Sequence, residues 1–274
     1  MVKRILSGVV GISFIVAVII LSGNFPVIID VFVAAVCAIA VGEFANAAEI
    51  LKHWHISFPS MAFAVIYPML MNYGSWLIVG YAYTAVMFSM LIFFHEKISF
   101  REFAYIYSMT VIITLSLSTI IQMKNMDNAH PAFYFVLTLA LPWLADAGAY
   151  FVGVFLGKHK LCPKISPKKT IEGAIGGTVV CILATCGVGW IFAEFVYKNI
   201  HVNYINLAIL SLIGSLLSIL GDLSFSVIKR TFEIKDYGNL IPGHGGVLDR
   251  FDSVVIVSPF LYIMMAYMPV IMGV

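Results

Sequence analysis

The chain alternates between long apolar stretches and short polar connections, and the apolar stretches have the length of membrane-spanning helices. A bilayer core about 30 Å thick requires about 20 mostly apolar residues in helical form. Hydropathy predicts nine such helices, at residues 5–22, 27–50, 58–73, 75–94, 103–122, 131–157, 171–196, 204–228 and 254–272. Two connections, 158–170 and 229–253, are longer and more polar than the others. We expect these two loops to carry the chemistry.

The composition supports an all-α, polytopic integral membrane protein. Of the 274 residues, 61% are hydrophobic and 11% are charged, and the mean hydropathy is +1.00. So few charged side chains cannot cover a soluble globule, which excludes soluble and disordered proteins. The first segment resembles a secretory signal, but its apolar run is longer than usual and no cleavage motif follows it. We therefore interpret it as a retained helix.

The distribution of Lys and Arg predicts how the helices are oriented. If the N-terminus is cytoplasmic, the loops on that side contain 14 of the 16 Lys and Arg residues, and only Lys124 and Lys198 lie opposite. Cationic loops are retained in the cytoplasm, so this asymmetry supports both the orientation and the short third helix. Loops 158–170 and 229–253 then face the cytosol, where nucleotides are found.

The densest polar segment begins near the end of the eighth helix with Asp222. Helical spacing puts Asp222 on one face with Ser226 and with Lys229 or Arg230. About seven helical residues separate Asp222 from the loop, which is roughly 10 Å at 1.5 Å per residue. A carboxylate inside a membrane costs about 2.5–3.5 kcal/mol even on lenient scales, so it should face a polar cavity or a cation.

Asp249 and Asp252 form an i, i+3 pair at the start of the ninth helix. If the intervening loop folds back and brings Asp249 to Asp222, the two carboxylates form a hard-oxygen site. Such a site suits Mg²⁺, which uses one or two carboxylates and completes its coordination with phosphate and water. A buried ion pair, either Asp222 with Arg250 or Asp249 with Arg230, is the alternative interpretation.

Two further segments have features of phosphate-binding sites. Pro242–Gly246 reads PGHGG, in which Gly245, Gly246 and the donor His244 suit an anion, although Gly-Pro clusters are often only turns. In the other loop, Ser166 and Pro167 predict a helix start beside Lys168 and Lys169. A helix N-terminus with adjacent lysines favours anions, whereas lysines that only set topology or contact anionic lipid are the alternative.

Other polar residues carry a weaker signal. Asp146 lies roughly 16 Å deep in the sixth helix, where it can bind a metal, orient a ligand or pair with a cation. Glu43, Asn46 and Glu49 lie near the cytosolic end of the second helix, and the sequence assigns them no role. The four cysteines have no zinc-binding spacing.

The carboxy-terminal half resembles a known family. The segment from Ser226-Val227-Ile228-Lys229-Arg230 through Lys235-Asp236 to PGHGGVLDRFD at 242–252 resembles the signature of phosphatidate cytidylyltransferases, the CDP-diacylglycerol synthases of bacterial type. The resemblance extends upstream to Gly221-Asp222, SPKKTIEG at 166–173 and DAGAYFVG at 146–153. Ala147 and Phe225 depart from the expected pattern, outside the signature.

The resemblance implies that CTP and phosphatidate react to give CDP-diacylglycerol and pyrophosphate, with Mg²⁺ and a second cation left open. It implies Asp222 and Asp249 as metal ligands, and Lys229, Arg230 and Arg250 as catalytic cations. The remaining site residues would contact substrate: Lys168, Lys169, Lys235, Asp236, Ser226, His244, Gly245, Gly246, Asp252 and Asp146.

The same resemblance predicts where the protein works. Residues 1–125 would form N-terminal transmembrane helices, and 126–274 a catalytic region with cytosolic loops 158–170 and 229–253, in the inner membrane of a bacterium. We expect lipid but no nucleic acid as a partner, and a homodimer is left open. An ion-coupled transporter lacks support because no inverted repeat is present. A CDP-alcohol phosphotransferase lacks support because its aspartate motif is absent.

Overall fold

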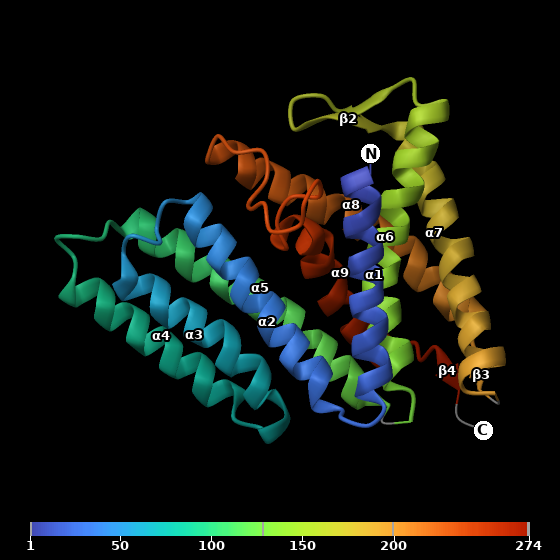
Figure 1. The fold of residues 1–274 in the computed structure, drawn as a ribbon, viewed down its shortest axis with the longest axis horizontal. Helices are drawn as coiled ribbons and strands as arrows, with labels where there is room; N and C mark the ends of the chain where they lie inside the picture. The colour runs from blue at the N-terminus through green and yellow to red at the C-terminus, as the bar shows by residue number, and fades with distance from the viewer. Residues whose placement is uncertain (1, 128, 199, 273–274) are drawn as a thin grey trace. The chain divides into compact units, whose positions relative to one another are not determined.

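The structure is a computed structural model that describes residues 2–127, 129–198 and 200–272, with the side chains described from Ser7 onward. The chain forms two compact units, and Figure 1 shows the helices of both. Unit 1 holds the chain up to Gln122 together with Thr231–Phe251, and unit 2 holds Met123–Arg230 and Asp252–Val274. The division is discontinuous in sequence, because most of the 229–253 loop belongs with the amino-terminal helices.

Nine α-helices are present in the described part of the chain, which confirms the all-α prediction. They are α1 (Val2–Ser22), α2 (Val27–Ala47), α3 (Trp54–Leu70), α4 (Trp76–Phe93), α5 (Phe100–Met126), α6 (Pro131–Leu156), α7 (Ile171–Ile191), α8 (Tyr204–Thr231) and α9 (Leu248–Tyr267). Helices α2 to α9 are long and apolar enough to cross a membrane, α3 with the turn after it, and the described apolar part of α1 is shorter, Ser7–Ser22. The short third helix is confirmed.

Unit 1 is a series of neighbouring helices. Helix α2 packs against α1 and α3, and α3 packs against α4. A 3-10 turn, η1 (Met71–Tyr73), and the left-handed Gly74 (φ 70°) end the α3 segment. Large side chains of α2 and its surroundings, such as Ile29, Phe44 and Ile56, are fully buried. Most of α4 presents apolar side chains outward, as expected for a helix in contact with lipid.

Unit 2 is built on the contact between α6 and α7. Glycines on both helices remove side chains at this contact: a Cβ on Gly177 would lie 2.7 Å from the backbone nitrogen of Ala149, and one on Gly148 would lie 2.8 Å from Cβ of Val180. Small residues let membrane helices approach closely, which replaces the hydrophobic drive that lipid does not supply. Phe133, Leu137 and Leu141 of α6 continue the core with Leu207 and Leu261 of α8 and α9.

A β-hairpin replaces the helix start predicted at Ser166 and Pro167, and that prediction is wrong. Strand β1 (Lys160–Cys162) pairs antiparallel with β2 (Ser166–Thr170). A two-stranded ribbon is all edge, so it tolerates a proline without an N–H. Helix α7 begins after the strand instead, where the Thr170 hydroxyl accepts the N–H of Gly173 at 3.1 Å.

Three short elements complete unit 2. A π-helical turn, η2 (Phe192–Val196), follows α7, and β3 (His201–Val202) pairs antiparallel with β4 (Ile271–Met272). The two strands tie the start of α8 to the segment after α9, since Asn203 N–H also donates to the carbonyl of Val270 at 2.7 Å.

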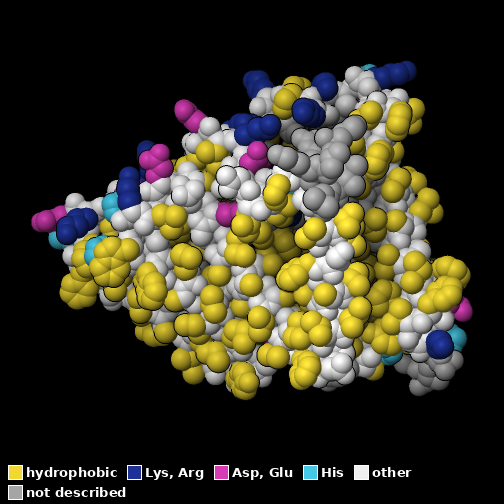
Figure 2. All heavy atoms as spheres, viewed as in Figure 1, with side chains coloured by type: hydrophobic (Ala, Val, Ile, Leu, Met, Phe, Trp, Pro, Cys, Tyr) yellow, Lys and Arg dark blue, Asp and Glu magenta, His cyan; other side chains and the backbone are white. Residues whose placement is uncertain are grey.

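Polar and apolar side chains are segregated on the surface. Figure 2 shows hydrophobic side chains along the flanks of the helices, and Lys and Arg side chains gathered over the β1–β2 hairpin. Lys158, Lys160, Lys164 and Lys168 of the hairpin are exposed. Lys3 and Arg4, which the topology prediction also counts as cytoplasmic, lie outside the described side chains. The orientation of the helices in a membrane stays a prediction.

Candidate functional site

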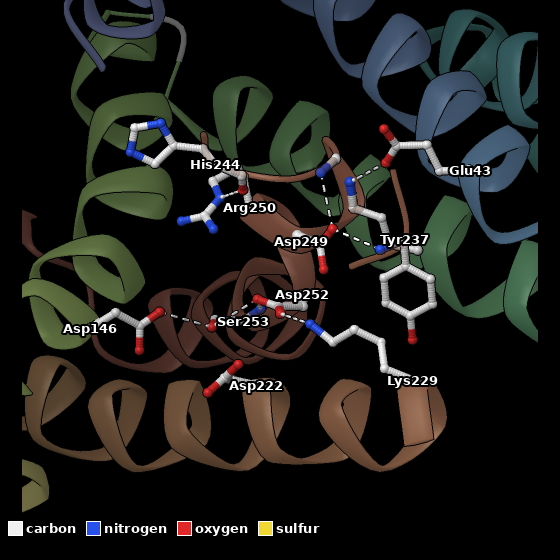
Figure 3. Close-up of polar contacts among 12 residues, drawn as sticks. Glu43, Asp146, Asp222, Lys229, Tyr237, His244, Asp249, Arg250, Asp252 and Ser253 are labelled. Atoms are coloured by element: carbon white, nitrogen blue, oxygen red, sulfur yellow. Dashed lines mark hydrogen bonds and ion pairs between the residues drawn. The ribbon is translucent and has the colours of Figure 1, made fainter. Parts of the chain in front are cut away.

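Some of the predicted site residues fall into two clusters, one in each unit, and Figure 3 labels many of the cluster members. The aspartate cluster in unit 2 contains Asp146, Lys169, Asp222, Lys229, Asp252 and Ser253. The loop cluster in unit 1 contains Glu43, Tyr237, Gly246, Val247, Leu248 and Asp249. Asp249 and Asp252 are three residues apart in helix α9, but Asp249 belongs to the loop cluster and Asp252 to the aspartate cluster.

The aspartate cluster is possible because α8 and α9 approach closely at Gly221. A Cβ at this position would lie 3.0 Å from Cα of Ser253 and 3.1 Å from the carbonyl oxygen of Asp252. Asp222 follows Gly221, and Asp252 precedes Ser253. The absence of a side chain at Gly221 therefore brings two aspartates from different helices into one region of unit 2.

Each of these aspartates has a lysine partner. The ammonium of Lys169, on strand β2, forms an ion pair with the Asp222 carboxylate. Lys229 Nζ lies 3.8 Å from Asp252 Oδ2, and both side chains are buried. The negative charges of Asp222 and Asp146 also act on Asp252. Three neighbouring acids, of which Asp252 is buried and Asp146 and Asp222 are partly buried, are unfavourable on their own, and the two lysines supply compensating charge.

Asp146 joins this cluster from α6. The Ser253 hydroxyl donates to Asp146 Oδ2 at 3.2 Å, and it also lies 3.3 Å from Asp252 Oδ1. The sequence left three roles open for Asp146, and the structure places it with the other two aspartates of unit 2. Ser253 is 1% exposed and was not predicted, because a serine in an apolar helix has no distinguishing signal.

Asp249 in the loop cluster accepts two hydrogen bonds from the backbone. Its Oδ2 accepts the N–H of Tyr237 at 2.8 Å and the N–H of Gly246 at 3.0 Å, and the side chain is buried. Gly243 and Gly245 have φ angles of 80° and 85°, which are accessible to glycine and strained for other residues. The glycines thus turn the chain back onto Asp249.

Glu43 completes the loop cluster from α2. Its Oε1 accepts the N–H of Val247 at 3.0 Å, and its Oε2 accepts the N–H of Leu248 at 2.8 Å, the first residue of α9. A carboxylate at this position satisfies N–H groups that a helix leaves unpaired at its start. The sequence alone assigns Glu43 no role, because 204 residues separate it from Val247 and no spacing rule links the two.

His244 and Arg250 lie on the outer side of the same loop. His244 Nδ1 and the Ser7 hydroxyl of α1 are 2.7 Å apart, and Arg250 Nε donates to the His244 carbonyl at 2.9 Å. Arg250 is exposed, while Gly246 is buried with its N–H directed to Asp249. Binding of a phosphate by the glycine loop stays a prediction.

The other predicted residues are mostly exposed. Lys168, Arg230, Lys235, Asp236 and Arg250 are exposed, and Ser226 is partly buried on α8. Glu172, which was not predicted, accepts the N–H groups of Lys158 and His159 and thereby closes the base of the hairpin that carries Lys169.

The donor atoms of the described residues fit a hard cation in their chemistry. Among the described residues, no three His, Cys, Asp or Glu side chains are placed to share an ion. Mg²⁺ needs only one or two protein carboxylates, so carboxylate oxygens such as those of Asp222 and Asp249 are suitable in chemistry. Asp222 belongs to unit 2 and Asp249 to unit 1, and their pairing stays a prediction.

Comparison with known proteins agrees with the resemblance in the signature. The chain is 41% identical over 169 residues to a phosphatidate cytidylyltransferase of Bacillus subtilis, which covers 61% of this chain and 60% of the relative. For the phosphatidate cytidylyltransferase of Staphylococcus haemolyticus, the identity is 45% over 142 residues, 52% of this chain and 51% of the relative. These matches thus span between half and two thirds of the two relatives.

A third relative matches over a longer stretch. The chain is 32% identical over 242 residues to a phosphatidate cytidylyltransferase of Staphylococcus aureus, which covers 87% of this chain and 90% of the relative. The sequence model of the cytidylyltransferase family matches residues 2–268, a range that includes both clusters and all nine helices. The chain therefore belongs to the cytidylyltransferase family.

Proposed function

We propose that this protein is a phosphatidate cytidylyltransferase. A phosphate oxygen of phosphatidate attacks the α-phosphorus of CTP and forms a new P–O bond. The bond between that phosphorus and the oxygen bridging to the β-phosphate breaks, and the products are CDP-diacylglycerol and pyrophosphate. The observation that supports this proposal most directly is the aspartate cluster: Asp222 and Asp252, on helices apolar enough to span a membrane, each pair with a lysine.

The reaction requires charge compensation more than proton transfer. A phosphate monoester has a second pKa near 6, so phosphatidate is largely ionised at neutral pH and needs no strong base. Two anions must approach each other while a third leaves, and such transfers depend mainly on positioning and electrostatic stabilisation. Lys169 and Lys229, with Arg230, Lys235, Arg250 and the exposed Lys168, would supply positive charge to the phosphates.

Asp222 and Asp249 would hold Mg²⁺, which would neutralise phosphate charge when bound. Before binding, Lys169 compensates Asp222, and backbone N–H groups compensate Asp249. Asp252 and Lys229 would keep the region beside Asp222 polar. His244, Gly245 and Gly246 would contact the substrate phosphates from the loop.

The decisive experiment uses purified full-length protein with phosphatidate, Mg²⁺ and each nucleoside triphosphate in turn. Formation of liponucleotide and of pyrophosphate in equal amounts, with CTP preferred, is the expected result. Diacylglycerol in place of phosphatidate is the control, because it lacks the attacking phosphate. Pyrophosphate release that is equal with and without phosphatidate would contradict the proposal.

The orientation is part of the proposal, since CTP is cytosolic. In bacterial cells, cysteines placed in loops 158–170 and 229–253 should be protected from a membrane-impermeant thiol reagent and should become labelled after permeabilisation. A cysteine beside Lys198 is the matched control and should be labelled in intact cells. Labelling of the two loops from outside would overturn the proposed topology.

A further inference from the structure

Glu43 and Asp249 bind successive backbone groups of the same turn. The N–H of Gly246 donates to Asp249, and the N–H groups of Val247 and Leu248 donate to Glu43. Three consecutive amides are thus bound by two carboxylates. The direction in which α9 leaves the turn, and with it the direction of the Asp249 side chain, depends on both acids.

The Glu43 carboxylate is closely enclosed by two glycines of the loop. A Cβ on Gly238 would lie 2.4 Å from Oε1, and a Cβ on Gly246 would lie 2.4 Å from Oε2. Distances this short exclude any side chain at either position unless Glu43 moves. The loop is therefore shaped around this carboxylate on both sides.

The residue after Glu43 holds the same loop by aromatic contact. The Phe44 ring is 5.7 Å from that of Phe232 and 6.3 Å from that of Tyr237, measured between ring centroids, and Phe44 is 1% exposed. The end of α2 thus contacts the loop through Phe44 near its beginning and through Glu43 near its end. These contacts leave the Tyr237 N–H facing Asp249.

The arrangement has a local electrostatic cost. Glu43 is close enough to Asp249 for the two negative charges to repel, and Glu43 is partly desolvated. A neutral acceptor would satisfy the two amides without this repulsion. The Glu43 carboxylate is therefore unfavourable beside Asp249, yet two amides donate to it and two glycines leave space for it. A local conflict of this kind is expected at a functional site.

We infer that Glu43 is a positioning residue, which fixes the Gly246–Asp249 turn and so sets the orientation of the Asp249 carboxylate. This inference rests on the proposed function, in which Asp249 takes part in the reaction. Glu43 acts through the turn and contacts no reacting atom. Its removal should therefore lower kcat more than it changes the KM values for CTP and phosphatidate.

The test compares Glu43→Gln with Glu49→Gln in the full-length protein. Both variants remove one negative charge at the same end of α2, but Glu49 is exposed and serves as the matched control. A glutamine presents one acceptor and one donor, so one of the two amides loses its partner. Loss of a hydrogen bond to a charged group corresponds to an expected fall in kcat of about 10- to 100-fold.

Hydrogen exchange of the same proteins without substrate gives a readout that does not depend on catalysis. Amides at 246–249 should exchange faster in Glu43→Gln and remain unchanged in Glu49→Gln. If wild-type protein makes no liponucleotide, the proposed function fails while this exchange result still decides whether Glu43 fixes the turn. If exchange is unchanged in Glu43→Gln, the inference fails while the proposed function stands.

A double-substitution cycle separates positioning from general destabilisation. Gly238→Ala alone should displace Glu43 and lower kcat, whereas in a Glu43→Ala background it should have little further effect, because the space is open. Independent, multiplicative losses would overturn the inference. So would unchanged kcat per folded molecule in Glu43→Gln, or a lower KM for CTP, which would mean that Glu43 occupies the anion site itself.

Discussion

Carboxylates are held in different ways in the two clusters. In the loop cluster, Glu43 and Asp249 accept hydrogen bonds from backbone N–H groups. In the aspartate cluster, Asp222 and Asp252 pair with the ammonium groups of Lys169 and Lys229. A backbone amide cannot leave its acceptor without a change in the fold, whereas a lysine on a flexible chain can be replaced by another cation.

This difference assigns the two regions different parts of one task. The loop cluster is a fixed frame, in which the chain itself determines where each carboxylate points. In the proposed function, the aspartate cluster would be a set of exchangeable charges, which would accept a metal ion or release a lysine toward phosphate. Transfer between two anions needs both properties, because positioning and charge compensation together stabilise its transition state.

The greatest loss of turnover should follow substitution of one aspartate from each cluster. Asp222→Asn and Asp249→Asn should each lower turnover on the order of 10⁴-fold, the scale seen when one member of a catalytic unit is lost, and the double variant should lose little more. The measurement is activity per folded molecule across a Mg²⁺ titration. Substantial turnover of either single variant at ordinary Mg²⁺ concentration would refute the metal assignment.

The same two variants should also differ in hydrogen exchange in the absence of substrate. Asp249→Asn should speed hydrogen exchange at the Tyr237 and Gly246 amides, because an amide oxygen is a weaker acceptor than a carboxylate. Asp222→Asn should leave those amides unchanged. Equal exchange in both variants would mean that Asp249 is not part of a fixed frame.

The next effect concerns the buried pair of Lys229 and Asp252. Lys229→Met strands a carboxylate that is 5% exposed, and removal of one partner of a buried pair costs about 3–5 kcal/mol. The double variant with Asp252→Asn should recover much of that loss, since it also removes the Asp252 charge that Lys229→Met leaves without this partner. Denaturant unfolding of the detergent-solubilised protein measures both. Additive losses would show that the two side chains are not coupled.

A smaller effect distinguishes neighbouring lysines of the hairpin. Lys169→Ala removes the partner of Asp222 and should lower activity about 10- to 100-fold, because the pair is only about one quarter exposed. Lys168→Ala removes an exposed charge worth less than about 1 kcal/mol, and its effect should vanish at high salt. Kinetics at two ionic strengths test this. Equal, salt-sensitive losses would reduce both lysines to general surface charge.

The sequence alone predicted the helices, and its assignment of the site chemistry stays a prediction. A span of about 20 apolar residues must satisfy its backbone hydrogen bonds internally when it crosses a membrane, and a helix does this. The prediction of the short third helix was therefore also correct. Asp222, Asp249 and Asp252 were found because an acid beside an apolar helix is expensive and therefore noticeable. Their density in one segment also carried the family resemblance.

What the sequence missed has a common physical cause. Glu43 meets Val247 across 204 positions, and Lys169 meets Asp222 across 53, so both contacts depend on tertiary packing. The hairpin at Ser166–Thr170 was mistaken for a helix start because Ser-Pro fits both structures locally. Thr170, four residues later, caps helix α7 instead. No local rule decides between Ser166 and Thr170 as the capping residue.

The smallest expected effect lies at the periphery of the two clusters. Ser253 donates to Asp146 beside Asp252, whereas Ser7 contacts the ring of His244 in the glycine loop. Ser253→Ala leaves a buried carboxylate short of a donor and should lower activity about tenfold, while Ser7→Ala loses one ordinary hydrogen bond, about 1 kcal/mol and less than about fivefold.

Both serine variants are assayed for liponucleotide formation per folded molecule, with Ser89→Ala on the exposed face of α4 as the control. Ser253→Ala should lower activity more than Ser7→Ala does, because the two clusters hold their carboxylates differently. A frame built from backbone should tolerate loss of one outer contact, whereas a cluster balanced by charge should not. If Ser7→Ala were the more damaging change, the glycine loop would depend on its contact with α1, and the division between fixed frame and exchangeable charges would have to be abandoned.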